Sequence, residues 1–301
     1  MSIEVQNITK LYGKQKALDQ VSFTVGTGQI VGFIGPNGAG KTTAIRIITG
    51  NIPPTSGMAK VEDLNVNEHD LKIKKLIGYL PEDNPLYDDL YIREYLNYVA
   101  GIYKIKNKKS RVDEVIELTG LTKEIKKQIG ALSKGYRQRV GLAQAIIHDP
   151  KVLILDEPTS GLDPNQIIEI RNLISLLGKK KTVILTTHIM QEVEAICDRV
   201  VIINNGKIVA DDEASKLSSS GVDDITVIVE FDKEIQPSAL KNIEGVTKAK
   251  ALEDNKYLLQ SKSGNDIRPK LFQYAVKNDL TVLSMNQKAK SLEDVFQELT
   301  K

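Results

Sequence analysis

The sequence predicts an α/β fold with buried parallel strands, and two observations support this prediction. An apolar segment over 29–34 runs directly into a glycine-rich turn, and a helical pattern follows over 41–50. Apolar runs at 152–155 and 182–186 are separated by a helical stretch over 165–178, as when a helix connects two strands buried on both faces of a sheet. We therefore expect a strand, a glycine loop and a helix to form one unit beside a parallel sheet.

The other elements of this first domain follow from the same periodicities. Alternating apolar residues predict short strands at 3–9 and 21–25, and Gly50 with Pro53-Pro54 ends the helix that begins at Lys41. Asn205-Gly206 predicts a β-hairpin because this dipeptide tolerates positive φ. Apolar residues three and four apart predict an inserted helical subdomain at about 85–150, with helices at 91–103, 111–119 and 132–147.

A second, smaller domain of α+β type is expected near the C-terminus. Ser218-Ser219-Ser220-Gly221 is typical of a linker, which places the first domain at 1–217 and the second at 222–301. The elements expected in the second domain are a strand at 225–231, a helix at 237–243, strands at 246–251 and 256–262, a helix at 266–278, a strand at 280–287 and a helix at 291–299.

Composition excludes several classes of function. The chain has 301 residues, and its 41 Lys and Arg side chains balance 39 Asp and Glu to a net charge of +2, so no nucleic-acid partner is expected. No apolar run approaches the roughly 20 residues of a bilayer span. The N-terminus lacks the pattern of a signal peptide, so we expect a cytoplasmic protein. Cys197 is the one cysteine, which excludes an internal disulfide and a cysteine-based zinc site.

A nine-residue stretch at the predicted strand–helix junction fits the phosphate-binding pattern G-x-x-x-x-G-K-[ST]. Glycines let backbone N–H groups close around phosphate oxygens, Lys41 would neutralise the β- and γ-phosphates, and the Thr42 hydroxyl would ligate Mg²⁺. The stretch consists of Gly35, Pro36, Asn37, Gly38, Ala39, Gly40, Lys41, Thr42 and Thr43. It predicts a binding site for a nucleoside triphosphate.

Two adjacent acids follow the apolar run at 152–155. Asp156 is placed to hold Mg²⁺, directly or through water, and Glu157 to orient and deprotonate an attacking water. Adjacent acids are often only solvated charge, but the apolar strand before them and Pro158 after them disfavour that alternative. The pair predicts hydrolysis of the bound nucleotide.

A third motif, Leu132-Ser133-Lys134-Gly135-Tyr136, lies 23 residues before Asp156. Ser133 before a helical pattern is favourable as an N-cap. Alternatively, the same helix N-terminus, with the Ser133 hydroxyl and the Gly135 amide, would face the γ-phosphate of a nucleotide held by another subunit. With this motif the sequence resembles the ATP-binding cassette (ABC) family, whose signature is usually Leu-Ser-Gly-Gly-Gln.

Further landmarks of this family follow in order. Tyr12 resembles the aromatic residue that stacks on adenine, and Ser160-Gly161-Leu162-Asp163 is similar to the D-loop. The resemblance implies that His188, 32 residues after Asp156, holds the γ-phosphate and positions Glu157 and water. From the residues alone, Tyr12 could be a packing residue and His188 a strand-end cap.

Two departures from the family pattern concern the site. Glu82 stands where the family usually has a glutamine, and its carboxylate either ligates Mg²⁺ while repelling the γ-phosphate or is a solvated loop acid. Lys134 and Tyr136 replace the usual glycine and glutamine of the signature. A Lys134 cation near the opposing phosphates or ribose would partly replace the missing glutamine contact.

The resemblance implies a Mg²⁺-dependent ATPase, the ATP-binding subunit of a multi-component transporter with ATP as its substrate. Two cassettes would pair head to tail around ATP, as a homodimer or with another cassette. Separate transmembrane permease subunits would hold the pair on the inner face of the membrane. The second domain is similar to tails of export-type bacterial cassettes, and the whole chain most resembles gliding-motility-associated ATP-binding subunits and related multidrug or sodium-efflux cassettes.

Other assignments remain open at this stage. A soluble cassette ATPase acting on ribosomes or DNA would often carry two cassettes, coiled coils or zinc sites, which this sequence lacks. A GTPase would need Asn-Lys-x-Asp, and the nearest string, 107–110, fails at its last position. The basic cluster Lys104–Arg111 is either a solvated helix end or loop or a contact with lipid headgroups beside a membrane partner.

Overall fold

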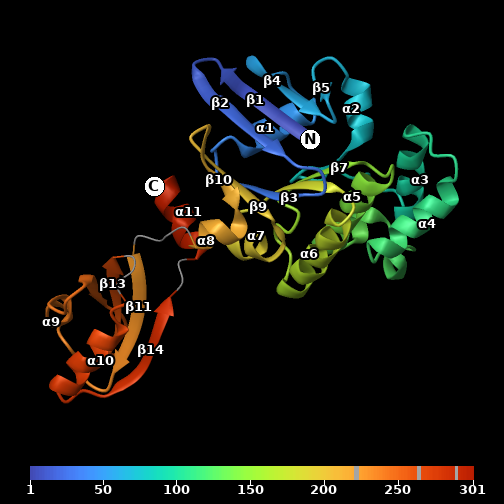
Figure 1. The fold of residues 1–301 in the computed structure, drawn as a ribbon. Coiled ribbons are helices and arrows are strands. Elements are labelled where there is room, and N and C mark those ends of the chain that lie inside the picture. Colours follow the sequence, from blue (N-terminus) through green and yellow to red (C-terminus); the bar gives the residue numbers. More distant parts are fainter. Residues whose placement is uncertain (220–223, 263–265, 289–290) are drawn as a thin grey trace. The chain divides into compact units, whose positions relative to one another are not determined.

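The computed structural model describes residues 1–219, 224–262, 266–288 and 291–301 (Figure 1). These residues form two compact units, Met1–Ala214 with Leu299–Lys301, and Ser215–Glu298. The segment predicted as a linker, 218–221, begins as the last turn of a helix, and its residues 220 and 221 lie outside the described ranges.

The first unit is built around a six-stranded sheet with strand order β10-β9-β3-β8-β7-β6. Its strands are β3 (Ile30–Ile34), β6 (Ile77–Leu80), β7 (Val152–Asp156), β8 (Thr182–Thr186), β9 (Arg199–Asn204) and β10 (Lys207–Glu213). All neighbours are parallel except β9 and β10. Strands β3, β7 and β8 are buried at every position, which confirms the parallel sheet predicted from their continuous apolar runs.

A second, antiparallel sheet has the order β2-β1-β4-β5. Its strands are β1 (Ile3–Tyr12), β2 (Gln15–Val25), β4 (Ser56–Val61) and β5 (Leu64–Asn65). The first two are longer than the predicted strands at 3–9 and 21–25. Register shifts interrupt their pairing at three places, and such bulges break the alternation by which a strand is found in a sequence.

Helix α1 (Lys41–Ile48) packs between the two sheets (Figure 1). Its residues Ile45 and Ile48 share one hydrophobic core with Val21 of the antiparallel sheet and with Phe33 and Ile154 of the parallel sheet. Because α1 follows the glycine loop directly, this burial on both sides fixes the loop at the carboxyl end of β3.

The other α-helices of the first unit connect its strands. They are α2 (Asp70–Leu76), α3 (Ile92–Ile102), α4 (Lys108–Leu118), α5 (Lys134–Ile146), α6 (Pro164–Gly178) and α7 (Met190–Ile196), with α8 (Ala214–Ser219) at the unit boundary. Helices α3, α4 and α5 contact one another and correspond to the predicted inserted helices. The β9–β10 turn has the positive φ predicted for Asn205 and Gly206, 48° and 75°.

Helix α5, which begins with the signature motif, is attached tightly to the parallel sheet. A Cβ atom on Gly78 of β6 would lie 2.1 Å from the carbonyl oxygen of Ala145, so only glycine permits this approach. At the end of α5 the Arg111 guanidinium donates to the carbonyl oxygens of Ile146 and Ile147, at 2.7 and 2.8 Å. These contacts hold the C-terminal end of α5, and the signature lies at the opposite end of this helix.

The second unit contains an antiparallel sheet of order β12-β13-β11-β14, covered by helices. Its elements are β11 (Asp224–Phe231), α9 (Pro237–Lys241), β12 (Val246–Ala251), β13 (Lys256–Lys262), α10 (Arg268–Lys277), β14 (Val282–Lys288) and α11 (Leu292–Thr300), the last residues of which belong to the first unit. Val229 and Tyr257 of the sheet share a core with Leu240 of α9 and Leu271 of α10. The α+β architecture predicted for this region is confirmed.

Candidate active site

A cavity of about 500 Å³ lies at the glycine loop. It is lined by Tyr12, Gln15, Ala17, Asn37, Gly38, Gly40, Lys41, Thr42, Thr43, Glu82, Asp156 and Glu157. The structure therefore brings together the phosphate-loop residues, the two acids and two isolated predictions, Tyr12 and Glu82. Gln15 and Ala17 were not predicted, because they belong to no motif in the sequence. They follow Tyr12 on the second strand of the same hairpin.

The loop keeps its shape because glycine occupies its crowded positions. Gly40 precedes α1 at φ 110°, and a Cβ there would lie 2.6 Å from the carbonyl oxygen of Ala17. A Cβ on Gly35 would lie 2.3 Å from the carbonyl oxygen of Ile203. Asn37, Gly38 and Gly40 line the cavity just before α1, where a helix N-terminus favours an anion.

Lys41 is nearly buried at the start of α1, with 9% of its surface exposed. Its Nζ donates to the carbonyl oxygens of Gly35 and Pro36, at 2.7 and 3.2 Å. Burial lowers the pKa of Lys41, whereas the nearby carboxylates of Glu157 and Asp156 act in the opposite direction. The ammonium is thus positioned by the loop itself.

Asp156 ends β7 directly opposite Thr186, the last residue of β8. The Thr186 hydroxyl donates to Asp156 Oδ1 at 2.6 Å. Burial raises the pKa of Asp156, and the bond from Thr186 and the charge of Lys41 oppose this shift. Thr186 was not predicted as a site residue. The sequence shows a polar residue ending an apolar strand, but only the structure shows that this strand lies in register with the strand that ends at Asp156.

Glu157 follows with a φ of 49°, a conformation that costs a non-glycine residue energy. Its N–H donates to the hydroxyl and carbonyl oxygens of Thr186, at 2.9 and 3.2 Å, and these bonds hold the turn. Glu157 Oε2 lies 2.9 Å from His188 Nδ1. Burial raises the pKa of Glu157, and the neighbouring His188 lowers it. A carboxylate with a raised pKa beside an imidazole is suited to accept a proton.

The residues present fit a magnesium ion. Thr42, Glu82 and Asp156 offer oxygen atoms to the same cavity. Mg²⁺ in nucleotide sites is bound by one or two carboxylates together with substrate phosphates rather than by an all-protein cage. In keeping with this, no group of three or more His, Cys, Asp or Glu with a metal-holding arrangement occurs in the described part of the chain.

Tyr12 ends β1 at the rim of the cavity. The residue is 51% exposed, and Lys10 Nζ lies over its ring, 5.4 Å from the ring centroid. A half-exposed ring at the edge of a phosphate site is a candidate for stacking on a base.

The signature motif does not line the cavity of its own chain. Ser133 is the N-cap residue of α5, as the sequence predicts, but its hydroxyl makes no capping hydrogen bond to the first turn of the helix. A Cβ on Gly135 would lie 2.5 Å from Gln166 Oε1, and one on Gly161 would lie 2.2 Å from Lys134 Nζ. The start of α5 is therefore packed on the D-loop segment and the start of α6, whereas the Tyr136 side chain is only half-buried.

Asp163 has a local role in the structure. It is the N-cap of α6, and its Oδ1 accepts a hydrogen bond from the Gln166 N–H at 2.9 Å. This bond orders the D-loop segment where it meets α5.

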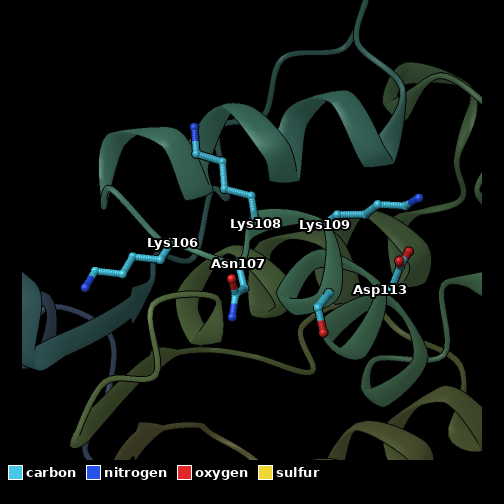
Figure 2. Close-up of a pocket in the computed structure, with 6 residues that line it drawn as sticks. Lys106, Asn107, Lys108, Lys109 and Asp113 are labelled. Carbon is cyan, nitrogen blue, oxygen red and sulfur yellow. The ribbon is translucent and has the colours of Figure 1, made fainter.

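The basic cluster at the start of α4 borders a hollow of about 720 Å³, lined by Lys106, Asn107, Lys108, Lys109, Ser110 and Asp113 (Figure 2). Figure 2 shows the side chains of Lys106, Lys108 and Lys109 pointing in three different directions, so their ammonium groups do not converge on one point. Arg111, which the sequence groups with them, is directed instead to the end of α5.

A glycine loop between a buried strand and a helix, with two carboxylates at the end of a parallel strand beside it, defines a P-loop nucleoside triphosphatase. Two family descriptions match the chain: "ABC transporter" over residues 18–160, and "ATP-binding protein DrrA1-3-like, C-terminal domain" over 219–300. The chain is 37% identical to the bacitracin transport ATP-binding protein BcrA of Bacillus licheniformis, over 99% of this chain and 96% of the relative. The chain belongs to the ABC transporter family, as an ATP-binding subunit.

Two solved structures extend this result. An ATP-binding subunit of an ABC transporter is 28% identical, with a TM-score of 0.68 over 73% of this chain and 93% of that one. A dimeric post-hydrolysis state of the cassette MJ0796, bound to ADP and Pi, is 25% identical, with a TM-score of 0.65 over 70% and 98% of the two chains. The cassette fold is thus confirmed, and these matches give no support to a ribosome- or DNA-directed ATPase.

Proposed function

We propose that this subunit is a Mg²⁺-dependent ATPase that works as a pair of cassettes and drives export through separate permease subunits. The single observation that carries the catalytic part is the 2.9 Å contact between Glu157 Oε2 and His188 Nδ1 at the edge of the phosphate cavity. It joins a buried carboxylate to an exposed imidazole, with 11% and 64% of the side chains exposed.

In this proposal Glu157 is the general base and removes a proton from the attacking water. His188 orients Glu157 and reaches the γ-phosphate with its outer ring atoms. Lys41 exchanges its bonds to the loop carbonyls for bonds to the β- and γ-phosphates, and Tyr12 stacks on adenine. Asn37, Gly38, Gly40 and Thr43 surround the phosphates as lining residues of the loop.

Thr42, Asp156 and Glu82 would hold the magnesium ion in this site. The ion supplies neutralisation of the phosphate charge when it is bound. Glu82 adds a second carboxylate to Asp156, which favours the cation and disfavours a nucleotide that arrives without it.

The pairing of two cassettes is supported by the position of the signature motif. Ser133, Lys134, Gly135 and Tyr136 lie outside the cavity of their own chain, and Ser133 and Lys134 are exposed, which suits a contact with the nucleotide of a second cassette. The similar MJ0796 cassette is described in a dimeric state. We propose a head-to-tail pair in the ATP-bound state, formed by two copies or by this chain and another cassette, in which Asp163 and its D-loop lie between the sites.

A membrane location follows from the same proposal. No helix in the described part of the chain has the length and apolarity to cross a bilayer. Permease subunits would therefore hold the cassettes at the cytoplasmic face of the membrane. Tyr87, Tyr91 and Tyr98 are 57%, 42% and 52% exposed, and this aromatic surface of the 83–100 region suits a permease contact.

Export is favoured because the relative BcrA is named for bacitracin transport and the C-terminal match is to a DrrA-like domain. The proteins compared above carry no gliding-motility name, and that narrower resemblance stays a prediction. We also retain the division into a cassette at 1–217 and an accessory domain at 222–301.

The oligomeric state of the Glu157→Gln protein tests the proposal. Light scattering with and without Mg-ATP, beside the phosphate release of the unmodified chain, should show an ATP-dependent dimer of the variant and slow hydrolysis by the parent. Normal hydrolysis by the variant would exclude Glu157 as the base. A variant that binds ATP but stays monomeric would contradict pairing by the cassettes alone.

A further inference from the structure

A buried carboxylate lies behind the Glu157–His188 pair. Glu192, in the first turn of α7, is 1% exposed. Its Oε2 accepts a hydrogen bond from the Thr187 hydroxyl at 2.9 Å. A carboxylate withdrawn from water is costly unless it is well bonded, and Glu192 Oε1 has no hydrogen-bond partner among the described residues. The packing of α7 alone would be served better by an apolar side chain.

The Thr187 hydroxyl makes two bonds that surround His188. It donates to Glu192, and it accepts the Ile189 N–H at 3.1 Å. The Ile189 carbonyl oxygen accepts the Glu192 N–H at 3.0 Å, which closes the ring of bonds. The residues on both sides of His188 are therefore tied to the same carboxylate-bearing residue.

The His188 side chain has one polar partner among the residues that the structure describes. It is 64% exposed, and its Nδ1 lies 2.9 Å from Glu157 Oε2. An exposed imidazole with one partner depends on its backbone for direction, because free rotation about its side-chain bonds would break the contact. The bonds of the Thr187 hydroxyl to Glu192 and to the Ile189 N–H hold the backbone on both sides of His188.

We propose that Glu192 is a positioning residue for ATP hydrolysis, which acts through Thr187 to keep His188 at hydrogen-bonding distance from Glu157. This inference rests on the function proposed above, because it assigns Glu192 to the His188–Glu157 pair. It concerns the rate of the chemical step and not the binding of ATP, since neither Glu192 nor Thr187 lines the phosphate cavity.

Two pairs of variants separate positioning from packing in the full-length chain. Glu192→Gln keeps an oxygen acceptor for Thr187, whereas Glu192→Leu keeps the bulk and removes the acceptor. Thr187→Ser keeps the hydroxyl, whereas Thr187→Val keeps the shape and removes it. Glu194→Leu is the matched control, because Glu194 is an exposed glutamate of the same helix.

We expect Glu192→Leu and Thr187→Val to lower kcat for Mg-ATP by about ten- to a hundredfold, the loss typical of a slightly misplaced catalytic group. KM should stay within about twofold, and Glu192→Gln, Thr187→Ser and Glu194→Leu should stay near the parent rate. A rise in KM alone, or a loss for Glu192→Gln equal to that for Glu192→Leu, would overturn the proposal.

The His188→Ala background provides the decisive comparison. If Glu192 acts through His188, then Glu192→Leu should lower kcat no further in this background, whereas a packing defect would lower it by the same factor as in the parent. If His188→Ala leaves kcat unchanged, the proposed role of His188 fails. If His188→Ala is slow but Glu192→Leu is not, only the present inference fails. Should Glu192→Leu not fold, the Thr187→Val and Thr187→Ser pair decides by the same criteria.

Discussion

Thr186 and Asp156 end neighbouring strands in register, and the threonine hydroxyl lies 2.6 Å from the aspartate Oδ1. The same hydroxyl accepts the N–H of Glu157 at 2.9 Å. One side chain thus holds both the proposed metal ligand and the proposed base.

Replacing this hydroxyl should weaken the metal site and the base together. We expect Thr186→Val to raise the Mg²⁺ concentration at half-maximal hydrolysis and to lower kcat, each by about tenfold or more, as outer-shell partners of metal ligands do. Titration of phosphate release with Mg²⁺ measures both quantities. Thr186→Ser is the control and should retain most of the activity; an equal loss in Thr186→Ser would show that the hydroxyl is not the cause.

Glu82 offers a test of charge in the phosphate cavity. We expect Glu82→Gln to tighten ATP binding in the absence of Mg²⁺ by up to about fivefold, because it removes a repulsion between anions that are partly screened by water. The variant should also need more Mg²⁺ for half-maximal hydrolysis. Equilibrium binding with EDTA, compared with binding in Mg²⁺, measures the two effects, and unchanged values would mean that Glu82 is a solvated loop acid.

Two glycines of the first unit should respond to alanine in opposite directions. Gly78→Ala forces a Cβ against the carbonyl oxygen of Ala145 at 2.1 Å, so we expect a loss of about 1–3 kcal/mol in the free energy of unfolding. Gly101→Ala, inside α3, meets only the flexible end of Lys108 at 3.4 Å and should be neutral or stabilising by up to about 1 kcal/mol. Chemical denaturation measures both, and equal stabilities would contradict the tight approach of α5 to β6.

His148 predicts a pH dependence of stability. Its ring stacks on Tyr103 with centroids 3.9 Å apart, and burial lowers its pKa to about 4. The unfolded chain therefore binds a proton between pH 6.5 and 4 that the folded chain does not, so stability falls as the pH falls through this range, by about 3 kcal/mol at most from this group.

His148→Phe keeps a ring against Tyr103 and removes the titrating group. Thermal unfolding from pH 7 to 4.5 should show a smaller decline for this variant than for the parent, although other acids also titrate there. Parallel declines in the two proteins would show that His148 does not contribute.

The sequence predicts the core of this site because its motifs are contiguous. The strand, loop and helix around Lys41 are encoded within a few residues, and Asp156 and Glu157 follow a strand that is visible as an apolar run. Thr186 and Glu192 were missed for a physical reason. Their roles depend on which strands become neighbours and on how a short helix returns to the sheet, and neither is encoded locally.

The elements between residues 50 and 80 show the same limit in the fold. Strands β4, β5 and β6 and helix α2 were not predicted. Strands β5 and β6 have two and four residues and α2 has seven, which is too short for a periodic pattern to emerge, and β4 is exposed over its first three residues. The C-terminal end of β1 and the N-terminal end of β2 were missed, where bulges break the alternation. Strand β7, whose five residues are all buried, and the 15-residue helix α6 were predicted within one or two residues of their observed bounds.

The contact between Lys134 and Gly161 has a consequence for the timing of ATP hydrolysis at the two sites of a pair of cassettes. The segment from Glu157 to Gly161 leads directly from the proposed base to the glycine on which Lys134 rests, at the start of the helix that would serve the other nucleotide. In a pair of cassettes, a shift of the base after one ATP is cleaved would thus reach the neighbouring nucleotide through only a few residues. ATP hydrolysis at the two sites of such a pair would then be coupled, and a defective site in one cassette would slow hydrolysis at the intact site of the other.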